Sequence, residues 1–447
     1  MDFDFTTLNT GGGVHPFVAD QGVTDPNIIS FSVAEMRLNL APVITEGMLR
    51  CVHTGSFGYA SPEEARYDAA VSAWMQRRHG WTVSMDTCTQ TTGVVTAMGI
   101  AIRALTEPGD GVIIQTPVYP PFAGSVKNNG RTLLENPLKC ENGVYSMDFE
   151  DLEQKAAQAK MLMLCSPHNP VGRVWTREEL QRLGEICRKH DLYVLSDEIH
   201  FDLDYQRRHM VLTQAAPELA DRCIICTAPS KTFNLAGNAL SNIFIENEEI
   251  RKKFQADQNV HCGHFLGTFA YASTTAAYEG GEAWLDALLV HLQKNRQVLV
   301  DRLSELIPGA VFSPLEGTYL QWIDLGCLGL PQEQLIKKLE SARSLSTTVC
   351  PSAPAVRGIS VSIWLAPQHP LKKPWIAWQR FYNFPQKGLL QATQQALFLN
   401  RCSLPQWALH PDWPHRSSAG RPWSASDPRC GSGPSAERSS GTGRRWQ

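Results

Sequence analysis

Residues 228–234, with the sequence APSKTFN, decide the fold of this chain, and two upstream strings point the same way. These strings are SDEIH at residues 196–200 and SPHNPVGRVW at residues 166–175. Each string follows a short apolar run and carries one side chain that can bind a ligand or take part in catalysis. These side chains are Asn169, Asp197 and Lys231.

Five apolar runs lie between about residues 45 and 285 and alternate with helical patterns, as in a doubly wound α/β sheet. Their centres are β-branched or rich in leucine, which is typical of strands buried on both faces. The runs are 111–115, 160–165, 192–195, 223–227 and 240–245. Ligands collect at the carboxyl ends of the strands in such sheets. We therefore expect one edge of the sheet to gather Tyr119, Asn169, Asp197 and Lys231.

A helix is predicted to begin after Thr176. Thr176 and Glu179 have the spacing of a capping box, in which each side chain bonds to the other residue's backbone N–H. A helical stripe of apolar residues follows, formed by Leu180, Leu183 and Ile186.

A lysine, an aspartate and an asparagine at one sheet edge are what pyridoxal 5'-phosphate (PLP) requires. The lysine holds the cofactor as a Schiff base, the aspartate keeps the pyridine nitrogen protonated, and the asparagine hydrogen-bonds to the ring hydroxyl. Taken singly, Asp197 could cap a helix, Asn169 could form a turn and Lys231 could be a surface charge. Their joint occurrence, in this order and spacing, favours a PLP site.

The phosphate of the cofactor needs backbone donors, and residues 92–95, TGVV, offer them ahead of a helical pattern at 97–105. A glycine at a helix start lets N–H groups approach a phosphate, and the helix dipole favours the anion. A glycine here is by itself usually only a turn. With the lysine site present, we expect Gly93 and Val94 to form the phosphate cradle, with Ser230 as a further donor.

Two tyrosines complete the candidate site. Tyr119 has an aromatic face that could stack on the pyridine ring, the alternative being ordinary core packing. Tyr59 is the weaker candidate on physical grounds. The expected catalytic residues are Lys231, Tyr119 and Asp197.

Composition narrows the class of protein. The chain has 447 residues, of which 43% are hydrophobic and 19% charged, with a net charge of -3. Its length favours two domains, and the absence of a basic stripe argues against nucleic acid. No apolar run is long enough to span a bilayer, and the first residues do not read as a signal peptide, so we expect a cytoplasmic protein with no membrane partner. A metal or redox role for the Cys223 and Cys226 pair is disfavoured, because residues three apart on a strand face opposite ways.

The chain resembles fold type I PLP enzymes, specifically the MalY/PatB group of cystathionine β-lyases (C–S lyases) within the class I/II aminotransferase superfamily. The resemblance extends from about Ile29 to Arg343. The strings that carry it are SVAEM (32–36), FGY (57–59), TPVY (116–119), PHNPVGR (167–173), DEIH (197–200), SKTFN (230–234) and EGTYL (316–320).

The resemblance implies an α/β protein of the PLP-dependent transferase fold type I, with a large, mostly parallel sheet flanked by helices and a smaller α/β domain. It implies a homodimer in which Tyr59 of one subunit reaches the phosphate site of the other, and it adds His200 to the cofactor-binding residues. The expected organisation is an N-terminal segment of the small domain (1–44), a PLP-binding large domain (45–285), a truncated small domain (286–343) and an aberrant tail (344–447).

The activity implied is α,β-elimination of an L-cysteine conjugate, such as cystathionine, to a thiol, pyruvate and ammonia. Lys231 is expected to remove the Cα proton while the ring held by Asp197 takes up the electrons. Two alternatives stay open. One is a class I/II aminotransferase, and the other is a catalytically impaired regulatory protein that keeps PLP and binds a partner.

Two departures from the family pattern keep the second alternative open. Met36 is followed by Arg37 and Leu38, where the family usually has an aspartate before the apolar residue. After Arg343 the expected glycine-rich stretch and arginine-bearing strand are replaced by a Pro-, Ser- and Trp-rich tail, in which only 389–399 has a helical pattern. Our hypothesis is that a frame change near Arg343 or Ser344 has replaced the family's ending. One allowed choice of synonymous codons in the shifted frame gives a sequence close to that ending, with its arginine spanning the codons of Ser360 and Val361.

Overall fold

A computed structural model describes ten ranges of the chain: 3–5, 29–31, 34–36, 38–206, 208–262, 266–331, 333–335, 337, 344–348 and 359–362. The chain divides into two compact units, Met1–Phe384 and Pro385–Gln447. All of the described residues belong to the first unit. The predicted helical pattern at 389–399 lies outside them.

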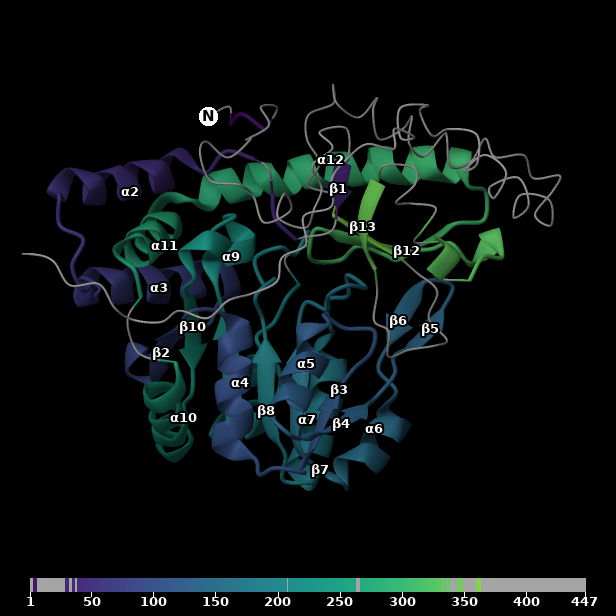
Figure 1. Ribbon diagram of the computed structural model, residues 1–447, viewed down its shortest axis with the longest axis horizontal. Helices are drawn as coiled ribbons and strands as arrows, with labels where there is room; N and C mark the ends of the chain where they lie inside the picture. The colour runs from purple at the N-terminus through teal and green to yellow at the C-terminus, as the bar shows by residue number, and fades with distance from the viewer. Residues whose placement is uncertain are drawn as a thin grey trace, which may run out of the picture. The chain divides into compact units, whose positions relative to one another are not determined.

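A seven-stranded sheet in the described residues confirms the predicted α/β architecture. Its order is β2 (Cys88–Thr91), β10 (Ser241–Phe244), β9 (Cys223–Thr227), β8 (Tyr193–Asp197), β7 (Ala159–Cys165), β3 (Gly111–Ile114), β4 (Thr132–Glu135). The ladder from β9 to β4 is parallel, whereas β10 is antiparallel to both of its neighbours. In Figure 1 the arrow of β8 accordingly points opposite to that of β10. The five predicted strands are all present, within two residues of their expected ends.

The central strands are buried on both faces, as their apolar runs predict. Successive residues of a strand point to opposite sides of the sheet, so each strand contributes side chains to two separate hydrophobic cores. In β9, Cys223 packs in one core and Cys226 in the other. This confirms that the two thiols face opposite ways and cannot share one ligand.

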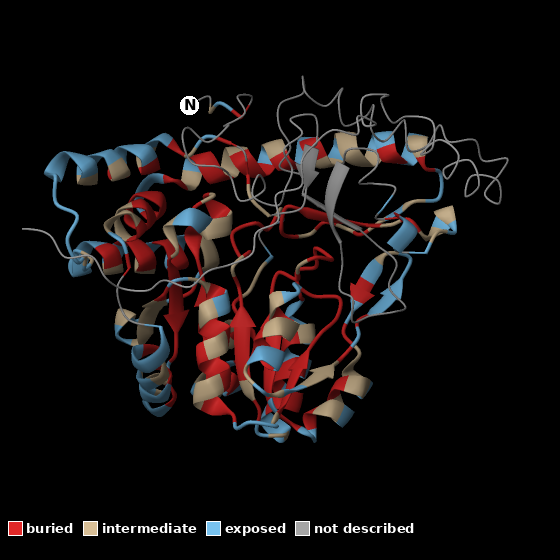
Figure 2. Ribbon diagram, in the orientation of Figure 1, coloured by how far each residue is buried: buried red, intermediate tan, exposed pale blue. Residues whose placement is uncertain are grey.

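Helices cover both faces of this sheet. Their bounds are α2 (Pro42–Thr54), α3 (Glu64–His79), α4 (Val94–Leu105), α5 (Pro121–Asn128), α6 (Phe149–Ala156), α7 (Arg177–Lys189), α8 (Leu212–Ala215), α9 (Pro229–Thr232), α10 (Glu248–His261), α11 (Thr268–Gly280) and α12 (Glu282–Leu306). Apolar residues of α4, α5 and α10 pack in one core, and those of α3, α6, α7 and α11 in the other. Figure 2 shows the strands between them buried and the outer faces of α2 and α10 exposed.

A second sheet brings the two ends of the first unit together. Its order is β1 (Ile29–Phe31), β13 (Ser344–Thr348), β14 (Ile359–Ser362), β12 (Leu320–Asp324), β11 (Val311–Phe312). β1 is parallel to β13, and the other pairs are antiparallel. A separate hairpin joins β5 (Lys139–Glu141) to β6 (Val144–Ser146). The predicted domain boundaries and the frame change stay predictions.

No helix in the described part of the chain is both long and apolar enough to cross a membrane. Nor do three or more His, Cys, Asp or Glu side chains gather there in a way that could hold a metal ion.

The capping box at the start of α7 gives a first prediction. The Thr176 hydroxyl accepts from Glu179 N at 3.2 Å, and a Glu179 carboxylate oxygen accepts from Thr176 N at 2.9 Å. We expect Thr176→Ala to lower the free energy of unfolding by about 1 kcal/mol. Thr176→Ser keeps the acceptor and should lose much less in the same denaturant titration. Equal losses in the two variants would show that the hydroxyl does not cap the helix.

Candidate active site

A cavity of about 250 Å³ lies at the carboxyl ends of the parallel strands. It brings together eight of the nine residues predicted for the site: Gly93, Val94, Tyr119, Asn169, Asp197, His200, Ser230 and Lys231. Tyr59 does not line it, and its side chain is 89% exposed. The roles of these nine residues toward a cofactor stay predictions.

One end of the cavity is the start of α4. Gly93 is the N-cap residue, and its φ of 154° is one that residues with a side chain rarely adopt. A Cβ placed on Gly93 would meet nothing within 4 Å, so the glycine leaves open space beside the first amides of α4. Helix N-terminal amides and the helix dipole attract anions. This end of the cavity therefore suits a phosphate.

Two loops meet along one side of the cavity. Tyr119 N donates to Asn169 O at 3.1 Å, which fixes the loop after β3 against the loop after β7. The buried ring of His168 reinforces this contact, since its Nε2 lies 2.9 Å from Pro117 O. Burial lowers the pKa of His168 to about 4, so the ring is neutral at physiological pH and donates from Nε2. Tyr119 and Asn169 are thus held by backbone contacts, which leave their side chains free for a ligand.

Lys231 extends from α9 across the cavity toward the N-terminal segment. Its Nζ donates to Ala34 O at 2.8 Å, and Tyr319 Oη donates to the same carbonyl at 2.8 Å. Burial lowers the pKa of Lys231, although the charges of Asp197 and Glu35 oppose this shift. A lowered pKa increases the fraction of neutral, nucleophilic amine.

Asp197 closes β8 and is 5% exposed. Burial raises the pKa of its carboxyl to about 7, with a smaller contribution from Glu198, while the Ile199 N–H and Lys231 act in the opposite direction. A buried carboxyl of this kind favours a cation beside it, because a positive charge compensates for lost hydration. A protonated ring nitrogen is such a cation.

His200 stands three residues beyond Asp197 and is 2% exposed. Burial lowers its pKa to about 3, with a further contribution from the charge of Lys231, so the imidazole is neutral. Its Nδ1 is buried without a hydrogen-bond partner. Buried polar atoms are normally paired, and an unpaired nitrogen on a cavity-lining ring indicates that a ligand completes this site.

Residues 34–36 are clamped over the cavity by the last residue of the APSKTFN string. Met36 N donates to Asn234 Oδ1 at 2.9 Å, and Asn234 Nδ2 donates to Met36 O at 2.5 Å. Asn234 has a φ of 57°, which asparagine tolerates better than most residues. The APSKTFN string therefore supplies both the amine of Lys231 and the Asn234 side chain. Asn234 holds the segment 34–36, which the Lys231 amine contacts.

Arg173 joins two other strings of the sequence. Its Nε donates to Glu316 Oε2 and its Nη2 to Glu179 Oε2, both at 2.9 Å. Gly317 N donates to Gly172 O at 3.0 Å. These contacts attach the EGTYL string to the large sheet and thereby place Tyr319 beside Ala34.

Sequence reasoning missed several contributors to the cavity and its contacts, and three of them show why. Ala34 acts through a backbone carbonyl, which has no side-chain signature. Ser241 lines the cavity at the amino end of β10, and a search of carboxyl ends alone passes over it because β10 is antiparallel. Tyr319 lies in a string that was singled out, but only its contact with Ala34 indicates a role.

Comparison with known proteins agrees with the geometry. The sequence model of the aminotransferase class I and II family matches residues 26–349. Cystathionine beta-lyase PatB of Bacillus subtilis (strain 168) is 41% identical over 321 residues, which cover 71% of this chain and 82% of PatB. Protein MalY of Escherichia coli (strain K12) is 30% identical over 328 residues, which cover 72% and 83% of the two chains.

A solved structure is similar over an even larger part of the chain. It is cystalysin from Treponema denticola, which contains a PLP cofactor, with a TM-score of 0.80 and 33% identity over 85% of this chain and 99% of cystalysin. The chain belongs to the aminotransferase class I and II family. Within that family it is of the MalY/PatB type.

The raised pKa of Asp197 predicts how the stability of the cofactor-free protein depends on pH. In the unfolded chain an aspartate loses its proton near pH 4, whereas in the fold Asp197 keeps it up to about pH 7. Unfolding therefore releases a proton between these values, and the free energy of unfolding falls as pH rises through this window. The fall attributable to Asp197 is at most about 1.4 kcal/mol per pH unit.

Asp197→Asn is the matched control, because it cannot ionise. Denaturant titrations of both proteins from pH 4 to pH 7 should show the wild type losing stability relative to the variant. Parallel pH profiles would mean that Asp197 is already ionised in the cofactor-free site at low pH.

Proposed function

We propose that this protein is a PLP-dependent carbon–sulfur β-lyase that converts L-cysteine conjugates such as cystathionine to a thiol, pyruvate and ammonia. The observation that carries the proposal is the arrangement of one cavity. A partly buried amine with a lowered pKa, Lys231, and a buried carboxyl with a raised pKa, Asp197, share it with the N-terminus of α4. The cystathionine beta-lyase PatB and the PLP-containing cystalysin are similar to this chain over most of its length.

The residues of the cavity fit PLP. Gly93, Val94 and Ser230 would hold the phosphate, and Asp197 would pair with the ring nitrogen. Asn169, and His200 with its unpaired Nδ1, are the polar groups available to the remaining ring substituents. Tyr119, which is 40% exposed, has a ring face available for stacking. When bound, PLP supplies an electron sink that makes the Cα proton acidic and lets a β-thiolate leave.

The chain's own groups would bind the substrate and move its proton. Lys231 is the only amine that lines the cavity in the described residues, and its free amine would act as the base for the Cα proton. The Ala34 carbonyl, which already accepts from Nζ, holds that amine near the reacting carbon. The clamp of Asn234 on Met36 keeps this carbonyl in place.

The direct test is absorbance and turnover of purified protein. With PLP, the wild type should absorb in the visible range and release pyruvate from cystathionine. Lys231→Ala should lose the visible band, and its pyruvate release should fall by orders of magnitude, because base and attachment point vanish together. Lys252→Ala, on the exposed surface of α10, is the matched control and should keep both properties. A colourless wild type, or keto-acid-dependent amino transfer without pyruvate release, would contradict the proposal.

A homodimer completes the site in this proposal. Tyr59 and Phe57 are 89% and 53% exposed, and on the neighbouring helix α2 the apolar Leu49 and Val52 are each 47% exposed. Clustered exposed apolar side chains are typical of a protein interface. Tyr59 is therefore available to a second copy of the chain, whose phosphate cradle it would reach.

Mixing two inactive variants tests this arrangement. If Lys231 acts in its own subunit and Tyr59 in the other, a mixed dimer of Lys231→Ala and Tyr59→Phe contains one intact site. Random pairing should then restore about a quarter of wild-type pyruvate release. A mixture of Lys231→Ala and Asp197→Asn forms no intact site and should restore nothing. Equal recovery in the two mixtures would place Tyr59 outside the partner's site.

A PLP-binding protein with impaired turnover is the second candidate function. Ser360 and Val361, at whose codons the frame-change hypothesis puts the family's arginine, lie in β14 opposite Trp322 and Gln321 of β12. An arginine pairs bidentately with a carboxylate, and serine and valine cannot. Under this alternative the visible band appears while pyruvate release stays low, so one sample distinguishes the two candidates.

We infer a cytoplasmic location from the thiols. Cys165, Cys187, Cys223 and Cys226 are buried and free, which suits a reducing compartment.

A further inference from the structure

Thr232, the neighbour of Lys231, makes a contact on the side of α9 away from the cavity. Its side chain is completely buried, and Oγ1 donates to Asp202 Oδ2 at 2.8 Å. Lys231 lines the cavity, whereas Thr232 does not. The orientation of Lys231 is thus linked, through the adjacent residue of α9, to a buried carboxyl group.

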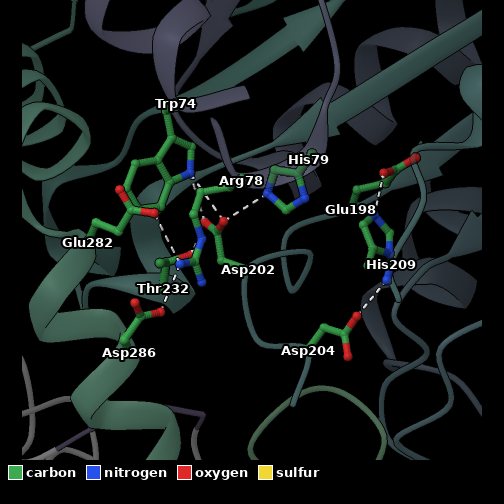
Figure 3. Close-up of polar contacts among 10 residues, drawn as sticks. All are labelled: Trp74, Arg78, His79, Glu198, Asp202, Asp204, His209, Thr232, Glu282 and Asp286. Atoms are coloured by element: carbon green, nitrogen blue, oxygen red, sulfur yellow. Dashed lines mark hydrogen bonds and ion pairs between the residues drawn. The ribbon is translucent and has the colours of Figure 1, made fainter. Parts of the chain in front are cut away.

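Asp202 collects donors from two elements that are distant in the sequence. Trp74 Nε1 lies 3.1 Å from Oδ1 and 3.3 Å from Oδ2, and His79 Nε2 lies 2.9 Å from Oδ1. Trp74 and His79 both come from α3, so Asp202 joins α3 to α9 (Figure 3). The Asp202 side chain has no exposed surface.

The α3 side of this junction is held firmly. Trp74 stacks on Tyr278 with ring centroids 5.2 Å apart, and the Arg78 guanidinium lies 5.7 Å from the Trp74 ring. Arg78 is fixed in turn by Asp286, 2.8 Å away at the start of α12 (Figure 3). The carboxyl of Asp202 is therefore attached to a rigid support.

The α9 side has little stability of its own. The helix has four residues, and its N-cap Ala228 offers no side-chain cap. Such a short helix does not hold its orientation in water without tertiary contacts. The Thr232–Asp202 hydrogen bond is a contact that limits rotation of α9 about its axis.

We propose that Asp202 is a positioning residue for Lys231, and that it acts through the Thr232 hydroxyl by fixing the rotation of α9. The inference rests on the proposed function, because the position of Nζ matters for attachment to PLP and for proton removal. Asp197 and Asp202 lie five residues apart, so one segment would control both the ring charge and the amine.

The test measures how fast cofactor-free protein attaches PLP to Lys231. Samples are quenched with borohydride at intervals after PLP is added, and the modified Lys231 peptide is quantified by mass spectrometry. Thr232→Val removes the hydroxyl without changing the shape of the side chain, and should slow attachment about tenfold or more. Thr232→Ser restores the hydroxyl and should return the rate to within about twofold of wild type.

Trp74→Phe is the matched control. It also removes one donor from the Asp202 carboxyl, but on the α3 side, so it should lower the melting temperature without slowing attachment. If Trp74→Phe slows attachment as much as Thr232→Val does, the network only stabilises the fold, and the inference is overturned. No attachment in the wild type would instead refute the proposed function.

A double variant shows whether Thr232 acts through Asp202. In an Asp202→Ala background, which has no acceptor for the Thr232 hydroxyl, Thr232→Val should slow attachment by less than about twofold further, because the two residues are members of one contact. A full additional tenfold loss in that background would show that Thr232 acts independently of Asp202, and would overturn the assignment.

Discussion

Two ionisable side chains, the buried Asp197 and the partly buried Lys231, share one cavity, and the rest of the structure is constrained by that pair. Each is costly to bury alone, and burial moves their pKa values toward each other, with that of the acid raised to about 7 and that of the amine lowered. Each of these two groups therefore takes on its charge less readily than it would in water. A ligand that places a cation beside Asp197 and an electrophile beside Lys231 would suit both side chains.

Two of the residues that hold this pair in place, Glu198 and Asp202, do not line the cavity. Glu198 accepts from Ser196 Oγ at 2.8 Å and from Leu212 N at 3.0 Å, and it lies 2.9 Å from His209 Nε2. Asp202 is fixed in a similar way to α3. Two buried carboxyl groups therefore anchor the two ends of the segment that begins with Asp197. Buried hydrogen-bonded networks of this kind favour one arrangement over its neighbours, which suits a segment that has to hold a charge in place.

The central sheet could be predicted from the sequence because its strands are apolar on both faces, and that pattern is local. The capping box of α7 is local as well, and it is confirmed atom by atom. The direction of β10 could not be predicted, since an apolar run carries no sign of its direction, and Ser241 was missed for this reason. Asp202 was missed because its partners on α3 lie more than a hundred residues away. Only the folded chain brings them together.

The site also depends on the smaller sheet, although few cavity side chains come from it. Ala34 follows β1 closely, and Tyr319 immediately precedes β12, so strands of the second sheet place the carbonyl and the phenol that meet at Lys231. β14 pairs with β12 along four residues, and β13 pairs with both β14 and β1. A change in the sequence after Arg343 therefore acts on the amine through hydrogen-bonded strands. In the proposed reaction, the groups that would hold the cofactor come from the large sheet, whereas the base Lys231 is held by the Ala34 carbonyl, which Tyr319 also contacts. Under that proposal, an altered ending weakens turnover before it weakens PLP binding.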